Sequence, residues 1–174
     1  MINKIKKTNR WYQDTFDDII DVRSPSEYNE DHIVGSINFP VLYDDERELV
    51  GKTYKNISPF QARIIGSSLT AFNISNHIKK QLLLKKGSWS PLIYCWRGGQ
   101  RSKSIAIVFS EIGWRVTLLR GGYKKYRTDV INQINNLSKK LKLILISGKT
   151  GTAKTKILQK IKIKKGQVLD LENL

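Results

Sequence analysis

Cys95 is the only cysteine in the chain, and it lies in the run Tyr94-Cys95-Trp96-Arg97-Gly98-Gly99-Gln100-Arg101-Ser102. A thiol acts as a nucleophile in its thiolate form, and proteins lower a thiol pKa with backbone N–H groups, a helix N-terminus and fixed cations. The glycines and arginines of this run supply groups of this kind. We therefore predict a nucleophilic cysteine in an anion-binding loop, against the alternative of a buried, inert thiol.

Each residue after Cys95 has an expected part in this loop. Arg97 and Arg101 are predicted to bind an anion or stabilise the thiolate, because a planar guanidinium suits oxyanions. Gly98 and Gly99 would let backbone N–H groups converge on the bound atom, and Trp96 would wall the pocket or stack on a base. Solvated cations, turn glycines and a buried tryptophan are the alternatives. The predicted anion-binding and substrate-binding loop comprises Trp96, Arg97, Gly98, Gly99, Gln100, Arg101 and Ser102.

The elements on either side of the loop fix its place in the fold. Residues 91–94 are typical of a short buried strand, and residues 102–112 are typical of a helix with Ile105, Phe109 and Ile112 on one face. The thiol would then lie in a strand-to-helix turn, at the positive end of the helix dipole.

Strands and helices alternate along most of the chain. Because alternation of this kind is typical of α/β proteins with a mainly parallel sheet, sites are expected at the carboxyl ends of the strands. The remaining expected strands are 16–23, 36–40 and 116–119, and the remaining expected helices start at Ser24-Pro25 and span 58–86 and 123–140.

The chain of 174 residues carries a formal net charge of +16. Such an excess favours a polyanionic partner, although a lysine-rich, merely solvated surface explains it equally well. Basic clusters at Lys79, Lys80, Lys85 and Lys86 and at Lys124, Lys125 and Arg127 are candidates for an RNA track or ordinary charged helix ends.

Several functions are not indicated by the sequence. No run approaches the roughly 20 apolar residues that span a bilayer, and the N-terminus is not a signal peptide. We therefore expect no membrane association and a reducing, cytoplasmic location, in keeping with a single cysteine. No metal site is expected: His32 is predicted to fix a loop and His77 to lie on a helix surface.

The composition changes after about Asp129, where ten lysines, three acids and no aromatic residue occupy the last 46 positions. Residues 141–146 are predicted to form a strand that leads into Ser147–Thr155, a segment close to a P-loop. Its expected phosphate-binding residues are Gly148, Gly151, Lys154 and Thr155. Ala153 stands where the pattern has glycine, so its Cβ is expected to disturb the phosphate cradle. An incomplete or decayed domain without nucleotide binding is the alternative.

Three further segments support a family resemblance. The runs Asp21–Tyr28 and His32–Pro40, the Cys95 loop and Gly121-Gly122-Tyr123 together resemble rhodanese-like domains over about residues 15–127. The resemblance implies that Cys95 carries sulfur or a related atom as a persulfide-type intermediate. Asp21 and Arg23 would lie near the site, more as a structural ion pair than as catalysts.

The spacing inside the loop leaves a second chemistry open. Five residues separate Cys95 from Arg101-Ser102, one more than in common sulfurtransferase loops. This is the spacing of cysteine-dependent phosphatases, including those with a rhodanese-like fold, and it makes a wider cradle for a tetrahedral anion. A phosphatase would also need a general acid, which the sequence does not identify.

A narrower match is to the tRNA 2-selenouridine synthase family. Four segments of the chain resemble that family in order: Cys95–Ser102, Gly121–Lys124, Gly148–Thr155 and Leu169–Glu172. The resemblance implies that Cys95 takes selenium from selenophosphate and passes it to wobble 2-thiouridine of tRNA, with geranylation from geranyl diphosphate as a second reaction. No tightly bound cofactor is implied.

The combined prediction is a rhodanese-like α/β domain over residues 1–128, with a mainly parallel central sheet flanked by helices. Residues 129–174 would form a linker helix followed by the incomplete start of a P-loop domain, which consists of a strand, the P-loop and a helix. A separately encoded C-terminal half is an expected alternative partner. The alternatives left open are a thiosulfate-type sulfurtransferase, a rhodanese-fold cysteine phosphatase and a non-catalytic tRNA-binding fragment.

Overall fold

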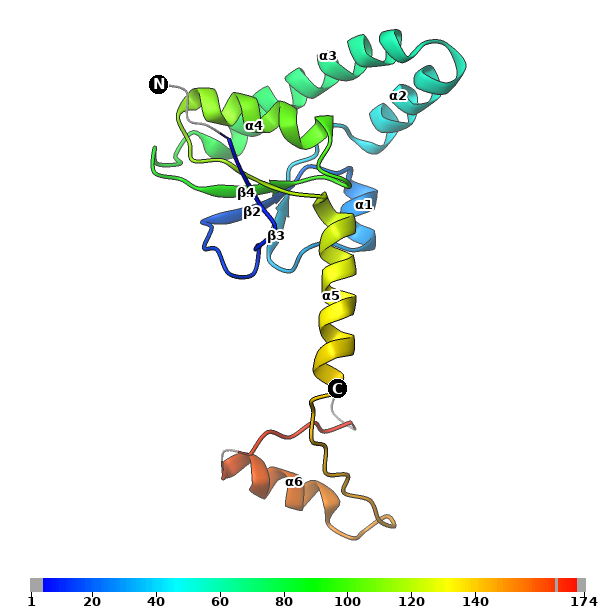
Figure 1. The fold of residues 1–174 in the computed structure, drawn as a ribbon, viewed down its shortest axis with the longest axis vertical. Coiled ribbons are helices and arrows are strands. Elements are labelled where there is room, and N and C mark those ends of the chain that lie inside the picture. Colours follow the sequence, from blue (N-terminus) through cyan, green and yellow to red (C-terminus); the bar gives the residue numbers. More distant parts are fainter. Residues whose placement is uncertain (1–4, 165, 172–174) are drawn as a thin grey trace. The chain divides into compact units, whose positions relative to one another are not determined.

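A computed structural model describes residues 5–164 and 166–171 of the chain. The chain divides into two compact units, Met1–Ile134 and Asn135–Leu174. The first unit holds the sheet, and the second holds helix α6 (Lys154–Ile163). Figure 1 follows the chain through both units.

The first unit contains a five-stranded sheet in the order β1-β5-β4-β2-β3, in which every neighbouring pair of strands is parallel. Strand β4 lies at its centre, with Leu92 paired to Ile19 of β2 on one side and to Thr117 of β5 on the other. The carboxyl end of the central strand therefore lies in the middle of one edge of the sheet. The strands are β1 (Lys6–Thr8), β2 (Asp18–Asp21), β3 (Ser36–Asn38), β4 (Pro91–Tyr94) and β5 (Thr117–Leu119).

The helices start and end at residues with recognisable capping chemistry. Ser58 accepts a hydrogen bond from the Phe60 N–H at the start of α3, whose first residue is Pro59. Gly113, with φ of 103°, ends α4 in the left-handed conformation that glycine favours. The helices are α1 (Pro25–Glu30), α2 (Asp44–Asn56), α3 (Pro59–His77), the π-helical turn η1 (Ile78–Leu82), α4 (Gln100–Ile112) and α5 (Gly122–Ser138).

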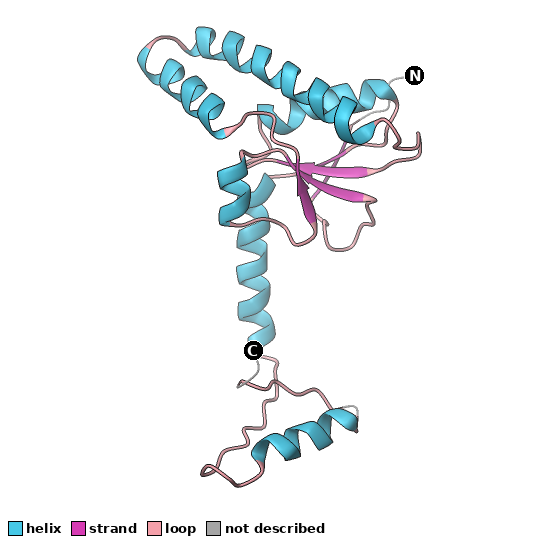
Figure 2. Ribbon diagram, turned by 180° about the vertical axis from the view of Figure 1, so that it is seen from behind, coloured by secondary structure: helices cyan, strands magenta, loops and turns pink. Residues whose placement is uncertain are grey.

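Helices cover both faces of the sheet, as Figures 1 and 2 show from opposite sides. On one face, Ile93 of β4 packs with Ile74 of α3 and Phe109 of α4 in the larger apolar cluster, which also includes Cys95. On the other face, Leu92 and Tyr94 pack with Tyr123 at the start of α5. Alternate residues of β4 thus face opposite layers, as the pleat of a strand requires.

The predicted α/β class with a mainly parallel sheet is confirmed. The four strands predicted in the first unit are present, β4 with the predicted bounds and the other three with shorter ones. The expected helix over 58–86 is α3 followed directly by η1. Strand β1 and helix α2 were not predicted. The prediction for His77 is wrong: this residue is 5% exposed, its Nε2 lies 2.9 Å from the Pro40 carbonyl oxygen, and its ring stacks on Phe39.

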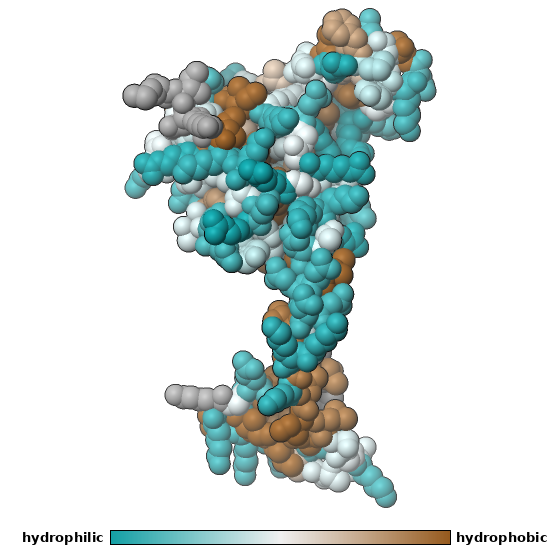
Figure 3. Space-filling model, in the orientation of Figure 1, coloured by the Kyte–Doolittle hydropathy of each residue, from teal (hydrophilic) through white to brown (hydrophobic). Residues whose placement is uncertain are grey.

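The second unit differs from its prediction at residues 141–146, which form no strand. A strand is stable only when a neighbour satisfies its backbone groups, and the described residues supply none there. Leu143, Ile144 and Leu145 are all more than 80% exposed, and no described residue from 135 onward is buried. Figure 3 shows the resulting apolar surface of this unit. The expected P-loop helix is present as α6, while Glu172 of the Leu169–Glu172 motif lies outside the described residues.

No helix in the described part of the chain is both long enough and apolar enough to cross a membrane.

Candidate active site around Cys95

Cys95 is the first residue after β4 and lies at the N-terminus of α4. The Gly99 N–H donates a hydrogen bond to the Cys95 Sγ over 3.2 Å, and the Ser102 Oγ lies 3.2 Å from the same sulfur. Ser102 also donates to the Gly99 carbonyl oxygen, which ties the first turn of α4 to the loop. A negative charge on the sulfur would meet both a backbone donor and the positive end of a 13-residue helix.

The sulfur lies at the base of its loop. Cys95 is 3% exposed and packs in the core, whereas Trp96 is 37% exposed and Arg97 is exposed. A reactant would therefore approach Cys95 past side chains of the loop rather than across an open surface.

The first residues of α5 pack against the backbone of the Cys95 loop. A Cβ on Gly122 would lie 2.1 Å from the Cys95 carbonyl oxygen and 2.8 Å from the Gly98 nitrogen, so only glycine fits there. The Tyr123 N–H donates to the Cys95 carbonyl oxygen at 2.9 Å, and the Lys124 N–H donates to that of Trp96 at 3.0 Å. The Gly121-Gly122-Tyr123 motif is thus a close backbone contact that holds the cysteine loop in place.

Arg101 is bound to a carboxylate from another part of the chain. Its guanidinium donates to both carboxylate oxygens of Glu27, at 2.6 and 3.3 Å, and Arg47 lies 3.2 Å from the same group. Burial opposes ionisation of Glu27, but the hydrogen bond and charge of Arg101, aided by Arg47, outweigh it and hold the pKa of Glu27 below its usual range. Part of the positive charge of Arg101 is therefore already neutralised.

Arg97 is the loop cation that remains available to an incoming anion. It is exposed and makes no ion pair with the described residues. The structure therefore separates the two loop arginines: Arg97 faces solvent, and Arg101 is held by Glu27.

Asp21 and Arg23 form a buried ion pair at the end of β2, next to β4. Their closest contact is 2.6 Å, and both side chains are at most 1% exposed. Burial alone would lower the pKa of Arg23, but its hydrogen bond to Asp21 and the charge of that carboxylate raise it. Arg23 also donates to the Asp31 carbonyl oxygen at 2.7 Å. The pair fixes the loop between β2 and β3, and its contacts are structural.

Aromatic contacts connect this ion pair to the loop. The Arg23 guanidinium lies 4.0 Å from the centre of the Tyr123 ring, and the Tyr123 and Trp96 ring centres are 5.6 Å apart. Tyr123 also donates to the Asp31 carboxylate, and burial and that carboxylate raise the pKa of Tyr123 to about 12. Trp96 therefore rests on a neutral, fixed tyrosine, with part of its own surface exposed beside Cys95.

The predicted phosphate-binding residues all lie in the second unit. Gly151 has φ of 85° and precedes the loop turn, while Lys154 Nζ donates to the carbonyl oxygens of Gly148 and Lys149, at 2.8 and 2.9 Å. Ala153 has φ of 58°, a left-handed conformation that disfavours a side chain. Thr155 lies in the first turn of α6. Lys154 and Gly148 are brought together, but the backbone is strained at Ala153, where the pattern has glycine.

The described residues contain no cluster of three or more histidine, cysteine, aspartate or glutamate side chains that would hold a metal ion.

Residues 5–129 match the model of the rhodanese-like domain, and the chain belongs to this family. The curated relatives to which it is similar are named tRNA 2-selenouridine synthase. That of Psychromonas ingrahamii is 37% identical over 81% of this chain and 38% of its own length, and that of Bdellovibrio bacteriovorus is 37% identical over 90% and 41%. The chain thus spans about two fifths of these relatives.

One solved structure supports the fold of the first unit. The N-terminal domain of a Clostridium difficile 630 protein, named for ATP or GTP binding, is 33% identical with a TM-score of 0.64. The match covers 74% of this chain and 99% of that domain. The predicted resemblance to the synthase family and the rhodanese-like fold are both confirmed.

Sequence reasoning missed Glu27, Arg47 and the supporting role of Tyr123. Glu27 lies inside the Asp21–Tyr28 motif, which was used for the resemblance, but nothing in the motif indicates that its partner is Arg101, 74 residues away. That pairing depends on the parallel arrangement of β2 and β4, which brings the two segments to one sheet edge.

Proposed function

We propose that this chain carries out the selenium-loading part of a tRNA 2-selenouridine synthase, with Cys95 as the acceptor. The observation that carries the proposal is the Cys95 sulfur at the N-terminus of α4, 3.2 Å from the Gly99 N–H. Relatives that bear the synthase name at up to 37% identity support selenium as the cargo.

The loading step is a transfer of selenium from phosphorus to sulfur. Cys95 is first held as a mixed disulfide with a small thiol, which supplies the two oxidising equivalents. The selenium of selenophosphate attacks the Cys95 sulfur, an S–Se bond forms and the small thiolate leaves. Water then attacks phosphorus, the Se–P bond breaks with its electron pair on selenium, and phosphate leaves. Arg97 is suited to bind the anionic phosphorus group as it enters and leaves, and Gly99 N–H stabilises the developing charge.

Transfer to RNA is the second half of the proposal. The terminal selenium of Cys95–S–Se⁻ attacks C2 of an activated 2-thiouridine, and sulfide leaves. A small thiol then attacks the Cys95 sulfur and forms a mixed disulfide with it. The S–Se bond breaks, and the selenium remains bonded to C2 of the uridine. Geranylation from geranyl diphosphate, phosphate binding by residues 148–155, a cytoplasmic location and a separately encoded partner stay predictions.

Intact-mass measurement under non-reducing conditions tests the loading step directly. The wild-type chain and Cys95→Ala are incubated with selenophosphate and a small disulfide, and separately with thiosulfate, and phosphorus products are followed by ³¹P NMR. We expect a selenium-sized mass gain over the untreated chain on the wild type alone, with phosphate released in equal amount. Absence of a gain with selenophosphate would overturn the proposal. A gain from thiosulfate only, with release of sulfite, would make the chain a sulfurtransferase.

A cysteine phosphatase is the second candidate, because five residues separate Cys95 from Arg101. The ion pair between Arg101 and Glu27 does not favour a phosphatase, since a phosphatase needs the guanidinium of this arginine to bind the transferred phosphoryl group. Hydrolysis of p-nitrophenyl phosphate that is lost in Cys95→Ala would select it. Retained RNA binding with no reaction at Cys95 would select a non-catalytic tRNA-binding fragment instead.

A further inference from the structure

A groove of about 1180 Å³ lies between α2, α3 and the first turns of α4. Gln100 and Arg101, two residues of the Cys95 loop, line one part of it. The groove therefore adjoins the Cys95 loop, although none of its residues from α2 and α3 takes part in the loading step.

The groove is strongly basic. Its lining contains a single carboxylate, Glu48, which is already paired with Lys52. Arg47 and Arg101 share Glu27, whereas Lys55, Arg63 and Lys103 are exposed and have no ion pair within the described residues. These three cations are free to bind phosphates. The six lining cations are Arg47, Lys52, Lys55, Arg63, Arg101 and Lys103.

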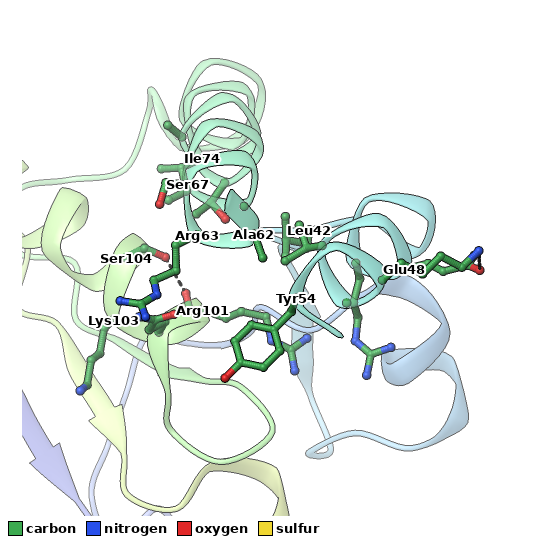
Figure 4. A pocket seen from close by; sticks show the side chains of 18 of the residues that line it. Leu42, Glu48, Tyr54, Ala62, Arg63, Ser67, Ile74, Arg101, Lys103 and Ser104 are labelled. Carbon is green, nitrogen blue, oxygen red and sulfur yellow. Dashed lines mark hydrogen bonds and ion pairs between the residues drawn. The ribbon is translucent and has the colours of Figure 1, made fainter. Parts of the chain in front are cut away.

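The lining between these cations is apolar and includes one exposed aromatic ring. Leu42, Ala62 and Ile74 form part of the wall and are buried, while Tyr54 is 57% exposed and Ile107 is 54% exposed. In Figure 4, Tyr54 from α2 and Arg63 from α3 project into the space between the helices. An occupant of this groove needs both flat apolar groups and several negative charges.

We infer that the groove binds a single-stranded segment of RNA. Its phosphates lie on Lys55, Arg63 and Lys103, and one of its bases stacks on Tyr54. Aromatic rings interleaved with cations are the usual means of binding unpaired nucleotides, whereas the bases of a duplex are not free to stack on a side chain. The inference rests on the proposed function in one respect: RNA in the groove would reach the Cys95 loop through Gln100 and Arg101.

Binding of a fluorescein-labelled anticodon stem–loop RNA, measured by anisotropy over a range of salt concentrations, tests the inference. The groove variant is Lys55→Glu, Arg63→Glu and Lys103→Glu together. The matched control is Lys139→Glu, Lys140→Glu and Lys142→Glu, which changes three exposed cations outside the groove by the same total charge. We expect binding to weaken at least tenfold more in the groove variant, and the salt slope to fall by about two.

Tyr54→Ala provides a second readout that does not depend on charge. Because Tyr54 is largely exposed, the variant is expected to fold, to bind the stem–loop RNA several-fold more weakly and to bind a blunt duplex unchanged. Tyr54→Phe should restore stem–loop binding. Equal losses for stem–loop and duplex would overturn the stacking contact.

The outcomes separate this inference from the proposed function. Selenium loading at Cys95 is measured on the same variants and needs no RNA. If selenium is loaded at Cys95 but the groove and control variants bind RNA equally well, RNA binding by the groove is refuted and the proposed function stands. If only the groove variant loses RNA binding and no variant loads selenium, RNA binding by the groove is supported and the proposed function is refuted. Binding of geranyl diphosphate that depends on the groove cations, with RNA binding unaffected, would assign the groove to an anionic amphiphile and overturn the inference.

Discussion

Arg101 and Glu27, 74 residues apart in the chain, form a two-point ion pair with distances of 2.6 and 3.3 Å. The pair connects the cysteine loop to α1, because Glu27 also accepts a hydrogen bond from the Ser24 N–H in the capping box of that helix. Rather than standing free to bind substrate, Arg101 holds two segments of the site together.

Glu27→Gln should destabilise the protein by about 1–2 kcal/mol, since Arg101 loses a charged partner but remains partly hydrated. The pKa of Glu27 is lowered from 4.5, so its contribution is complete above that pH and is lost as the pH falls through the folded-state pKa. The difference in unfolding free energy between wild type and variant should therefore shrink below pH 4.5. Chemical denaturation at several pH values measures it, and a difference that does not depend on pH would contradict the prediction. Glu48→Gln, in an exposed pair with Lys52, is the control.

Gly122→Ala should destabilise the protein by about 2–4 kcal/mol, because its Cβ would overlap backbone atoms of the Cys95 loop at a positive φ. Loading at Cys95 should fall in the same variant as the loop is displaced. Gly87→Ala is the control, since a Cβ there meets nothing within 4 Å, and it should change stability by less than about 0.5 kcal/mol. Thermal unfolding followed by circular dichroism compares the two, and equal midpoints would show that the close contact is unimportant.

His77 should make the protein less stable in mild acid. Burial lowers the pKa of His77 from 6.5, and Lys80 lowers it further, against the opposing effect of the Pro40 carbonyl. The unfolded chain therefore binds a proton first, so stability present above pH 6.5 is lost as the pH falls through the lower folded-state pKa. Between pH 7.5 and pH 5, the unfolding free energy of His77→Gln should therefore fall less steeply with decreasing pH than that of the wild type. The same change at half-buried His32 is the control, and an unchanged slope in the His77 variant would refute the assignment.

Ala153→Gly should increase the affinity of the 148–155 loop for Mg–ATP about fivefold. The left-handed conformation of Ala153 costs about 1 kcal/mol, which lowers the population of the loop shape seen here, and glycine removes that cost. Fluorescence titration with a labelled ATP analogue measures the effect. Lys154→Ala should abolish binding in both backgrounds. Identical affinities with alanine and glycine would show that position 153 does not limit phosphate binding.

Much of the first unit follows from local sequence patterns. The apolar run at residues 91–94 and the glycine-rich turn after it predict a strand and helix on either side of Cys95, and both are present. Strand β1 was missed because two of its three residues are lysines, and only its pairing with β5 makes it a strand. Helix α2 was missed because only Leu49, Val50 and Tyr54 among its 13 residues are apolar or aromatic, which is too few to indicate a helical period clearly.

The details of the site depend on contacts between distant segments. Sequence patterns predict that Asp21 and Arg23 pair, because the two residues are close in the chain and their charges are opposite. They do not reveal that Glu27 holds Arg101 or that Gly122 packs on Cys95. Residues 141–146 show the converse: a strand pattern is present, but no neighbouring strand lies among the described residues.

The pairing of β1 with β5 sets an order of events during synthesis of the protein. Lys6–Thr8 leave the ribosome before their partners, Thr117–Leu119, which are made more than one hundred residues later. The central strand β4 likewise follows β2 by about seventy residues. Residues 6–8 therefore stay without their partner strand until residue 119 has been made, so slowing elongation before that residue should prolong their exposure to chaperones and proteases.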